Sequence, residues 1–190
     1  MNNVLVDLIR SNSWIMRVLG AVRDEATADA WVGAGVIRDL VWGERYGAGF
    51  WPEPVRDVDV AFFDQADLSR ANDDHATAQL ARRLAGVPWE AKNQAAVHTW
   101  YPHKFGGDAV EPLTSIRDAV GTWPEAATAV AVRLSVTDAI EICAPLGLDD
   151  LLNGVWRRSP RRIRVEQSRA RLERHQPGAR WPRVTVVPPT

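Results

Sequence analysis

The sequence predicts an α+β fold in which helices flank a mixed β-sheet. Segments whose apolar residues recur at helical spacing alternate along the chain with short apolar runs that are typical of strands. The composition agrees, because 46% of the 190 residues are hydrophobic and 25% are charged, as in ordinary soluble domains. A chain of this length buries roughly 70% of its unfolded surface, so it needs no disulfide or structural metal.

Hydrophobic spacing and turn residues locate the elements of the N-terminal part. Apolar residues three or four positions apart, such as Leu5, Leu8 and Ile9, predict amphipathic helices. Glycine and proline mark turns and loops. The expected elements, in chain order, are helices over 3–20 and 23–29, a strand at 31–32, a glycine turn at 33–35, a helix over 36–42, a loop over 47–54 and a strand over 55–64.

The same criteria apply to the rest of the chain. Asp73 or Asp74 is the expected N-cap of an alanine-rich helix, because a carboxylate accepts hydrogen bonds from free N–H groups of a first turn. Two apolar stretches separated by Thr137-Asp138 predict a hairpin. The expected elements are a helix to residue 84, a strand over 87–91, helices over 94–100 and 115–120, strands over 129–136 and 139–144, helices over 149–156 and 161–175, and an irregular end over 177–190.

Charge is divided unequally along the chain. The net charge is −1, but from Trp156 onward ten arginines stand against two glutamates. We therefore expect a domain over 1–155 and an arginine-rich C-terminal helix and tail over 156–190, packed on it or extending from it. The tail suits contact with an acidic face or with a polyanion such as nucleotide phosphates or RNA; a solvated helix is the simpler alternative.

The compartment follows from cysteine usage and the N-terminus. Cys143 is the single cysteine, so no intramolecular disulfide can form, and its apolar neighbours predict a buried thiol. The first ten residues lack the basic and then apolar layout of a signal peptide, and no apolar stretch is long enough to span a bilayer. We expect a cytoplasmic protein without a membrane partner.

Three features in a fixed order indicate chemistry. The turn Gly33-Ala34-Gly35 opens a helix, whose N-terminus offers unpaired N–H groups to a phosphate. Asp57 and Asp59 share one face of a strand, roughly 7 Å apart, a spacing that suits a divalent cation with oxygen ligands. Glu90, in a third apolar strand, can complete a two-metal site or accept a proton. The expected ion is Mg²⁺, or Mn²⁺.

Each of these residues has a simpler interpretation. An Asp-x-Asp pair is common on solvated strands, and the upstream glycine turn is what makes it informative. Glu90 can be a surface ion-pair partner, with Asp64 or Glu141 in its catalytic role. Arg38 either pairs with a carboxylate or contacts a phosphate, and Lys92 either recognises a nucleotide or acceptor or belongs to the cap of the next helix.

The order of these features resembles a known enzyme signature. The run from Gly33 to Asp39, followed by Arg56-Asp57-Val58-Asp59-Val60, is similar to the nucleotidyltransferase signature of the polymerase β superfamily. It is found in the head domains of CCA-adding enzymes and bacterial poly(A) polymerases. The strings at 89–95, 123–129 and 144–151 resemble a compact bacterial family of nucleotidyltransferase-like proteins. The resemblance spans most of the chain and implies a polymerase β-like nucleotidyltransferase fold.

The resemblance also implies a reaction. A nucleoside monophosphate is transferred from a nucleoside triphosphate (NTP) donor to an acceptor, with a divalent metal ion and release of pyrophosphate. Asp57 and Asp59 match the paired metal ligands, and Glu90 matches the third carboxylate, as ligand or base. The nucleotide-binding residues that we expect are Gly33, Ala34, Gly35, Arg38 and Lys92.

The chain departs from the family pattern in two ways. Its turn is Gly-Ala-Gly rather than Gly-Gly or Gly-Ser, and the loop over 47–54 lengthens the connection to Asp57. CCA-adding enzymes carry further helical domains that recognise tRNA, for which 190 residues leave no room. The acceptor is therefore open between a small molecule, a protein side chain and an RNA end. The alternative function is a catalytically inactive nucleotide- or RNA-binding regulatory module of the same fold.

Overall fold

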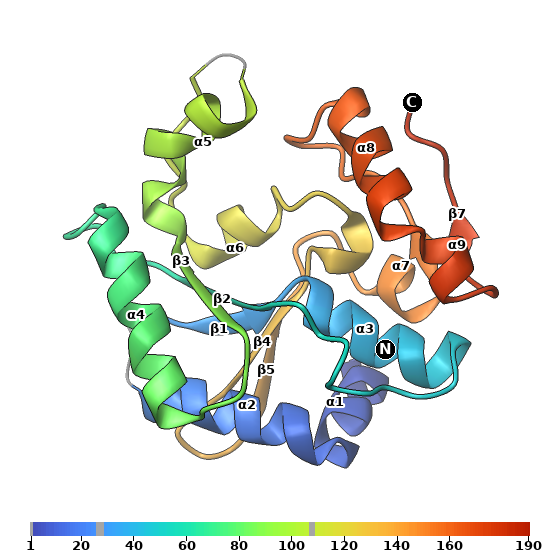
Figure 1. Ribbon diagram of the computed structural model, residues 1–190, viewed down its shortest axis with the longest axis horizontal. Helices are drawn as coiled ribbons and strands as arrows, with labels where there is room; N and C mark the ends of the chain where they lie inside the picture. Colours follow the sequence, from blue (N-terminus) through green and yellow to red (C-terminus); the bar gives the residue numbers. More distant parts are fainter. Residues whose placement is uncertain (1, 26–28, 107–108) are drawn as a thin grey trace.

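Five strands form a mixed sheet at the centre of the computed structural model, which describes residues 2–25, 29–106 and 109–190 (Figure 1). The strand order is β3-β2-β1-β4-β5, in which β2 and β3 are parallel and the other neighbours are antiparallel. Helices flank the sheet, so the predicted α+β class is confirmed. The strands are β1 (Trp31–Gly33), β2 (Val58–Phe62), β3 (Trp89–Asn93), β4 (Ala131–Leu134) and β5 (Ile140–Cys143).

The N-terminal region contains two helices, α1 (Asn2–Ser11) and α2 (Ser13–Asp24), so the expectation of one helix over 3–20 is wrong. Asn12 separates them, because its side chain accepts a hydrogen bond of 3.0 Å from the Ile15 N–H and caps α2. The separate helix expected over 23–29 does not start at residue 23, because residues 23 and 24 are the last two of α2. Residues 26–28 of that range lie outside the described residues.

Helix α3 (Gly35–Tyr46) follows the glycine turn as expected, whereas α4 (Arg70–Arg83) begins earlier than expected. Ser69 caps α4, because its side chain accepts from the Asn72 N–H, so the predicted cap at Asp73 or Asp74 is wrong. Asp73 is buried inside the helix and accepts the Asn93 N–H at 2.7 Å. Its carboxylate therefore fastens α4 to β3.

The strands are shorter than, or shifted from, the expected ranges. β2 does not extend over the whole of 55–64, and β3 lies two residues later than the expected 87–91. Val58 donates its N–H to the Pro88 carbonyl at 2.8 Å, and Pro88 has no N–H to return, so the regular pairing of β3 starts at Trp89. The hairpin of β4 and β5 is confirmed, but its turn is centred on Val136-Thr137, one residue earlier than expected, because the Asp138 N–H donates to the Ser135 carbonyl at 3.0 Å.

Short helices lie between β3 and β4. They are η1 (Gln94–Ala96), α5 (Val97–Phe105), α6 (Ile116–Val120) and η2 (Ala126–Thr128), which agrees with helical predictions at 94–100 and 115–120. The predicted helix over 149–156 is too long, since α7 (Asp149–Leu152) ends before Gly154. This glycine adopts a positive φ of 65° and leads into β6 (Val155–Trp156), so the chain changes direction there.

The C-terminal segment is more ordered than expected. It contains α8 (Val165–His175), α9 (Pro177–Arg180) and β7 (Thr185–Val186), which pairs in parallel with β6. The expectation of an irregular end is therefore wrong, because this pairing joins residues about 30 positions apart and leaves no local periodicity. Trp181 is buried and packs edge-on against Trp42 of α3, with ring centroids 5.2 Å apart.

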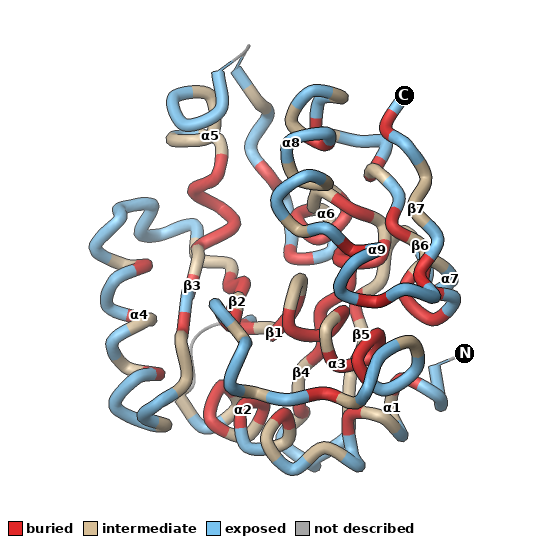
Figure 2. Tube along the Cα trace, turned by 45° about the vertical axis from the view of Figure 1, so that its right-hand side comes forward, coloured by how far each residue is buried: buried red, intermediate tan, exposed pale blue. Residues whose placement is uncertain are grey.

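Burial follows the sheet and its inner helices. Figure 2 shows buried residues along the strands and on α2 and α3, whereas α4, α8 and α9 expose most of their outer surfaces. Cys143 is buried, as predicted. In the part of the chain that the structure describes, no helix has both the length and the apolar character needed to cross a membrane.

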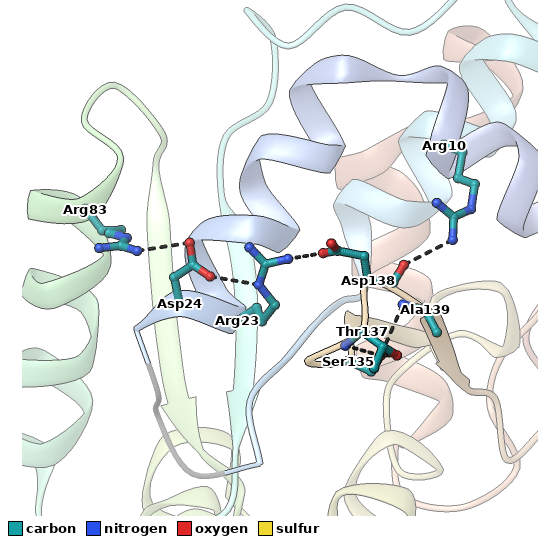
Figure 3. A network of polar contacts seen from close by, with 8 residues as sticks. All are labelled: Arg10, Arg23, Asp24, Arg83, Ser135, Thr137, Asp138 and Ala139. Atoms are coloured by element: carbon teal, nitrogen blue, oxygen red, sulfur yellow. Dashed lines mark hydrogen bonds and ion pairs between the residues drawn. The ribbon is translucent and has the colours of Figure 1, made fainter.

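A chain of charged groups joins four elements at one edge of the molecule (Figure 3). Arg83 of α4 pairs with Asp24 at 3.0 Å, and Asp24 pairs with Arg23 at 2.7 Å. Arg23 also pairs with Asp138 of the hairpin turn, whose carbonyl accepts from Arg10 of α1 at 3.1 Å. We call these five residues the edge ion-pair chain. Hydrogen bonds from Arg23 and Arg83 lower the pKa of Asp24.

Candidate active site

A cleft of about 790 Å³ opens over β2 and β3 and is bounded by the first turn of α3 and by α8 and α9. In Figure 1 these C-terminal helices lie across from β2 and β3. The lining includes seven of the eight residues that the sequence predicts for the site. These are Ala34, Gly35, Arg38, Asp57, Asp59, Glu90 and Lys92.

Strand register brings the predicted carboxylates together. Asp59 of β2 pairs with Glu90 in the parallel strand β3 and with Gly33 in the antiparallel strand β1. Residues paired in this way present their side chains to the same face of a sheet. Asp57 lies two residues before Asp59, so it shares that face. The fold therefore gathers three carboxylates from separate parts of the sequence at one end of the cleft.

The two aspartates lie close to other carboxylates and are not held in ion pairs. Within residues 2–25, 29–106 and 109–190, no side chain forms an ion pair or hydrogen bond with Asp57 or Asp59. Burial, with the added charges of Asp57 and Glu90, raises the pKa of Asp59 to about 7. Partial burial and the Glu90 carboxylate also raise the pKa of Asp57. The charges of Arg38 and Arg171 offset part of the rise at Asp59, and those of Arg38 and Arg56 part of the rise at Asp57, but burial and the crowded carboxylates outweigh them.

Such a pair fits a hard divalent cation. Carboxylate oxygens are the ligands that Mg²⁺ and Mn²⁺ prefer, and a bound cation would relieve the repulsion that raises these pKa values. Among the described residues, no group of three or more His, Cys, Asp or Glu side chains is placed to hold a metal ion together. The expectation of a metal site therefore rests on Asp57 and Asp59 as a pair, with Glu90 as a carboxylate on the neighbouring strand.

The glycine turn has two parts with different roles. Ala34 adopts φ 57° and ψ −124°, a conformation that favours glycine, and its N–H donates to the Val130 carbonyl at 3.1 Å. Gly35 begins α3 and lines the cleft, where the first-turn N–H groups of a helix have no intrahelical acceptor. Gly33 does not line the cleft; a Cβ there would lie 2.6 Å from the Trp123 ring, so packing requires a glycine.

Arg38 lies in a tightly packed position. It is 3% exposed and donates to the Asp39 carboxylate at 2.6 and 2.9 Å. Its guanidinium lies 5.4 Å from the ring centroids of both Trp156 and Trp181 and 5.9 Å from that of Trp42. Of the two alternatives, this geometry favours pairing with a carboxylate, that of Asp39 in the same helix. The contacts with Trp156 and Trp181 join Arg38 to the C-terminal segment.

Lys92 is partly buried and lines the cleft from β3. Its Nζ lies 3.7 Å from carboxylate oxygens of both Asp73 and Glu90. The cap of the following helix is Asn93, whose side chain accepts the Ala95 N–H at 3.1 Å. Lys92 therefore presents its charge to the cleft rather than capping η1.

The sequence did not identify the residues that the C-terminal segment contributes. Arg171 forms two hydrogen bonds, of 2.6 and 2.9 Å, with the fully buried carboxylate of Glu125. Arg180 pairs with Asp39 at 3.0 Å. Burial, with the nearby Arg171 and Arg38 charges, lowers the pKa of His175 to about 4, so its imidazole is neutral at pH 7. The excess of arginine after residue 156 was the available signal.

Five of the lining residues that were not predicted come from α8, α9 and the residue between them. They are Arg171, Arg174, His175, Gln176 and Arg180.

Comparisons with known proteins identify the family and the fold. The model of the nucleotidyltransferase family matches residues 20–186. A structure solved by NMR and described as a CCA-adding enzyme head domain has 30% sequence identity and a TM-score of 0.80, covering 96% of this chain and 94% of that one. A comparison with curated proteins found no match.

Two larger enzymes share the fold at lower identity. The Thermotoga maritima CCA-adding enzyme complexed with tRNA has 16% identity and a TM-score of 0.56, covering 98% of this chain and 42% of that one. A tRNA nucleotidyltransferase complexed with a primer tRNA and an ATP analogue has 18% identity and a TM-score of 0.52, covering 89% of this chain and 46% of that one. This protein spans less than half the length of either. The family match and the head-domain fold confirm the predicted resemblance, and the chain belongs to the nucleotidyltransferase family.

Proposed function

We propose that the protein transfers a nucleoside monophosphate from an NTP to an acceptor and releases pyrophosphate, in a reaction that requires Mg²⁺ or Mn²⁺. The observation that carries this proposal is the crowding of Asp57 and Asp59, without an ion-pair partner among the described residues, beside Glu90 in a large cleft. Membership of the nucleotidyltransferase family supports transfer in general. A regulatory module that had lost catalysis would have no use for this repulsion, so it remains the weaker candidate.

The proposed roles follow from where the carboxylates lie. Asp57 and Asp59 hold the divalent ion, which when bound supplies positive charge that offsets the charge developing on the α-phosphate. An acceptor oxygen forms a bond to the α-phosphorus, the bond from phosphorus to the α,β-bridging oxygen breaks, and its electron pair leaves with pyrophosphate. Glu90, which is exposed at the same end of the cleft, takes the acceptor's proton.

The nucleotide-binding residues take different parts in this proposal. The N-terminus of α3 attracts the triphosphate through the free N–H groups of its first turn, which begins at Gly35, while Ala34 shapes the turn before it. Lys92 adds a positive charge on the β3 side of the cleft. Arg38 and Gly33 act indirectly, Arg38 by holding α3 against the C-terminal segment and Gly33 by giving space to Trp123.

A transfer assay tests the proposal. The protein is incubated with each α-labelled NTP and Mg²⁺, in turn with small-molecule, protein and RNA acceptors, and both labelled product and pyrophosphate are measured. Asp57→Asn and Asp59→Asn should each lower the rate at least 100-fold. The matched control is Asp7→Asn, which changes an exposed aspartate of α1 and should leave the rate unchanged. Wild-type rates in both site variants would refute the assignment.

A further inference from the structure

We propose that α8 forms a pyrophosphate subsite of the cleft, in which Arg174 binds the β- and γ-phosphates of the donor and then the leaving pyrophosphate. The inference rests on the proposed function, because it assigns the far end of the same substrate. It gives the arginine-rich segment a defined ligand, a triphosphate tail. The sequence indicated that the arginine-rich tail suits an acidic face or a polyanion, but not which of its residues lies at the cleft.

The cleft carries its three predicted carboxylates and its C-terminal arginines on different walls. One wall carries Asp57, Asp59 and Glu90 on the sheet, and the other carries arginines of α8 and α9. Arg171 and Arg174 are three residues apart and therefore lie on one face of α8, toward the cleft. A triphosphate whose α-phosphate lies at the carboxylate wall has its remaining phosphates free to extend toward this helix, where positive charge is available.

The partners of these arginines single out Arg174. Arg171 is held by two hydrogen bonds to Glu125, and Arg180 is paired with Asp39. No carboxylate among the residues that the structure describes forms an ion pair with Arg174; its Nη2 lies 3.4 Å from His175 Nε2. Of the three arginines that α8 and α9 contribute to the cleft, Arg174 is therefore the one whose N–H donors are not committed to a carboxylate. A planar guanidinium binds phosphate oxygens in pairs.

The position of Arg174 is fixed by its neighbours on the helix. The Glu125 carboxylate is 0% exposed, so the Arg171–Glu125 pair anchors α8 to the segment before η2. One residue after Arg174, the His175 ring packs against Trp156, with centroids 5.5 Å apart. A phosphate ligand placed here needs little rearrangement of the backbone, which is what an electrostatic subsite requires. When the bond from the α-phosphorus to the α,β-bridging oxygen breaks, Arg174 stabilises the negative charge that leaves with pyrophosphate.

Binding measurements separate this subsite from the rest of the cleft. Calorimetric titrations with Mg²⁺ use three ligands: an NTP, the corresponding nucleoside monophosphate and inorganic pyrophosphate. Arg174→Gln should weaken binding of the NTP and of pyrophosphate at least tenfold and change monophosphate binding less than twofold. Arg174→Lys, which keeps the charge but not the paired donors, should fall between wild type and Arg174→Gln.

The matched control is Arg169→Gln, which removes the same charge from an exposed position on the same helix, outside the cleft lining, and should bind like wild type. Equal pyrophosphate and NTP affinities in Arg174→Gln and Arg169→Gln would overturn the subsite. So would a loss restricted to an RNA oligonucleotide, with pyrophosphate binding retained. If wild type binds the NTP through Asp57 and Asp59 while Arg174→Gln has no effect, only this inference fails. If wild type binds no NTP, the proposed function fails with it.

Discussion

The edge ion-pair chain and the carboxylate end of the cleft use the same residue types in opposite ways. At the edge, Asp24 lies between Arg23 and Arg83, and Asp138 pairs with Arg23 (Figure 3). In the cleft, Asp57 and Asp59 lie beside another carboxylate, Glu90, and their pKa values rise rather than fall. The paired set fastens helices and a hairpin to one another. The unpaired set destabilises the isolated fold, which is explained if a ligand supplies the missing charge.

The largest effect on stability should come from a third arrangement of charges, the ion pair between Arg171 and the buried Glu125 on the cleft wall. Arg171→Ala leaves the Glu125 carboxylate buried without its partner, so we expect the free energy of unfolding to fall by about 3 kcal/mol. Urea unfolding measures the change. The control Arg169→Ala should have little effect, and adding Glu125→Gln to Arg171→Ala should recover part of the loss. An unchanged stability in Arg171→Ala would show that this pair does not anchor α8.

Asp59→Asn should change stability less than Arg171→Ala does, and should raise the free energy of unfolding rather than lower it. The pKa of Asp59 is about 7 in the folded protein and 3.8 in the reference state, so this carboxyl favours folding at low pH and loses that contribution as pH rises through 7. Asparagine stays neutral. We therefore expect the variant to be more stable than wild type by about 2 kcal/mol at pH 8 and equal to it near pH 4. Urea unfolding at both pH values checks this, and a less stable variant at pH 8 would contradict the account.

Asp24→Asn should change stability least of the three, and should lower it rather than raise it as Asp59→Asn does. Its pKa is lowered by Arg23 and Arg83, so Asp24 stabilises the fold above its ordinary pKa and loses that effect in acid. The group is exposed, so the loss of stability at pH 8 should be slight and should disappear in high salt. A stabilising Asp24→Asn would remove the contrast between the two regions.

Local chemistry made part of the site predictable. The glycine turn, Asp57 with Asp59, and Glu90 were identified because turn residues and strand alternation act over a few positions. The structure places all but Gly33 at the cleft, while their roles there remain proposals. The mixed sheet and the hairpin were also predicted. The starts of α2 and α4 were not, because several polar residues near each start can serve as a cap, and only the structure shows that Asn12 and Ser69 do so.

Long-range packing explains what could not be predicted. The environment of Arg38 is made by Trp156 and Trp181, more than 100 residues later in the chain, so its burial has no local signature. The pairing of β6 with β7 and the placement of α8 across the cleft depend on the same tertiary contacts. Composition indicated that the tail is cationic, but only the fold shows that Arg171 and Arg174 line the cleft.

The most direct test of the central claim is a thermal-shift titration with NTP and Mg²⁺ on wild type and on the double variant Asp57→Asn with Asp59→Asn, at pH 8. Without ligand, the double variant should melt at a higher temperature than wild type, because it lacks the repelling charges. With NTP and Mg²⁺ together, wild type alone should gain stability. An equal metal-dependent gain in the double variant, or none in wild type, would contradict the claim that these carboxylates form a metal-dependent nucleotide site.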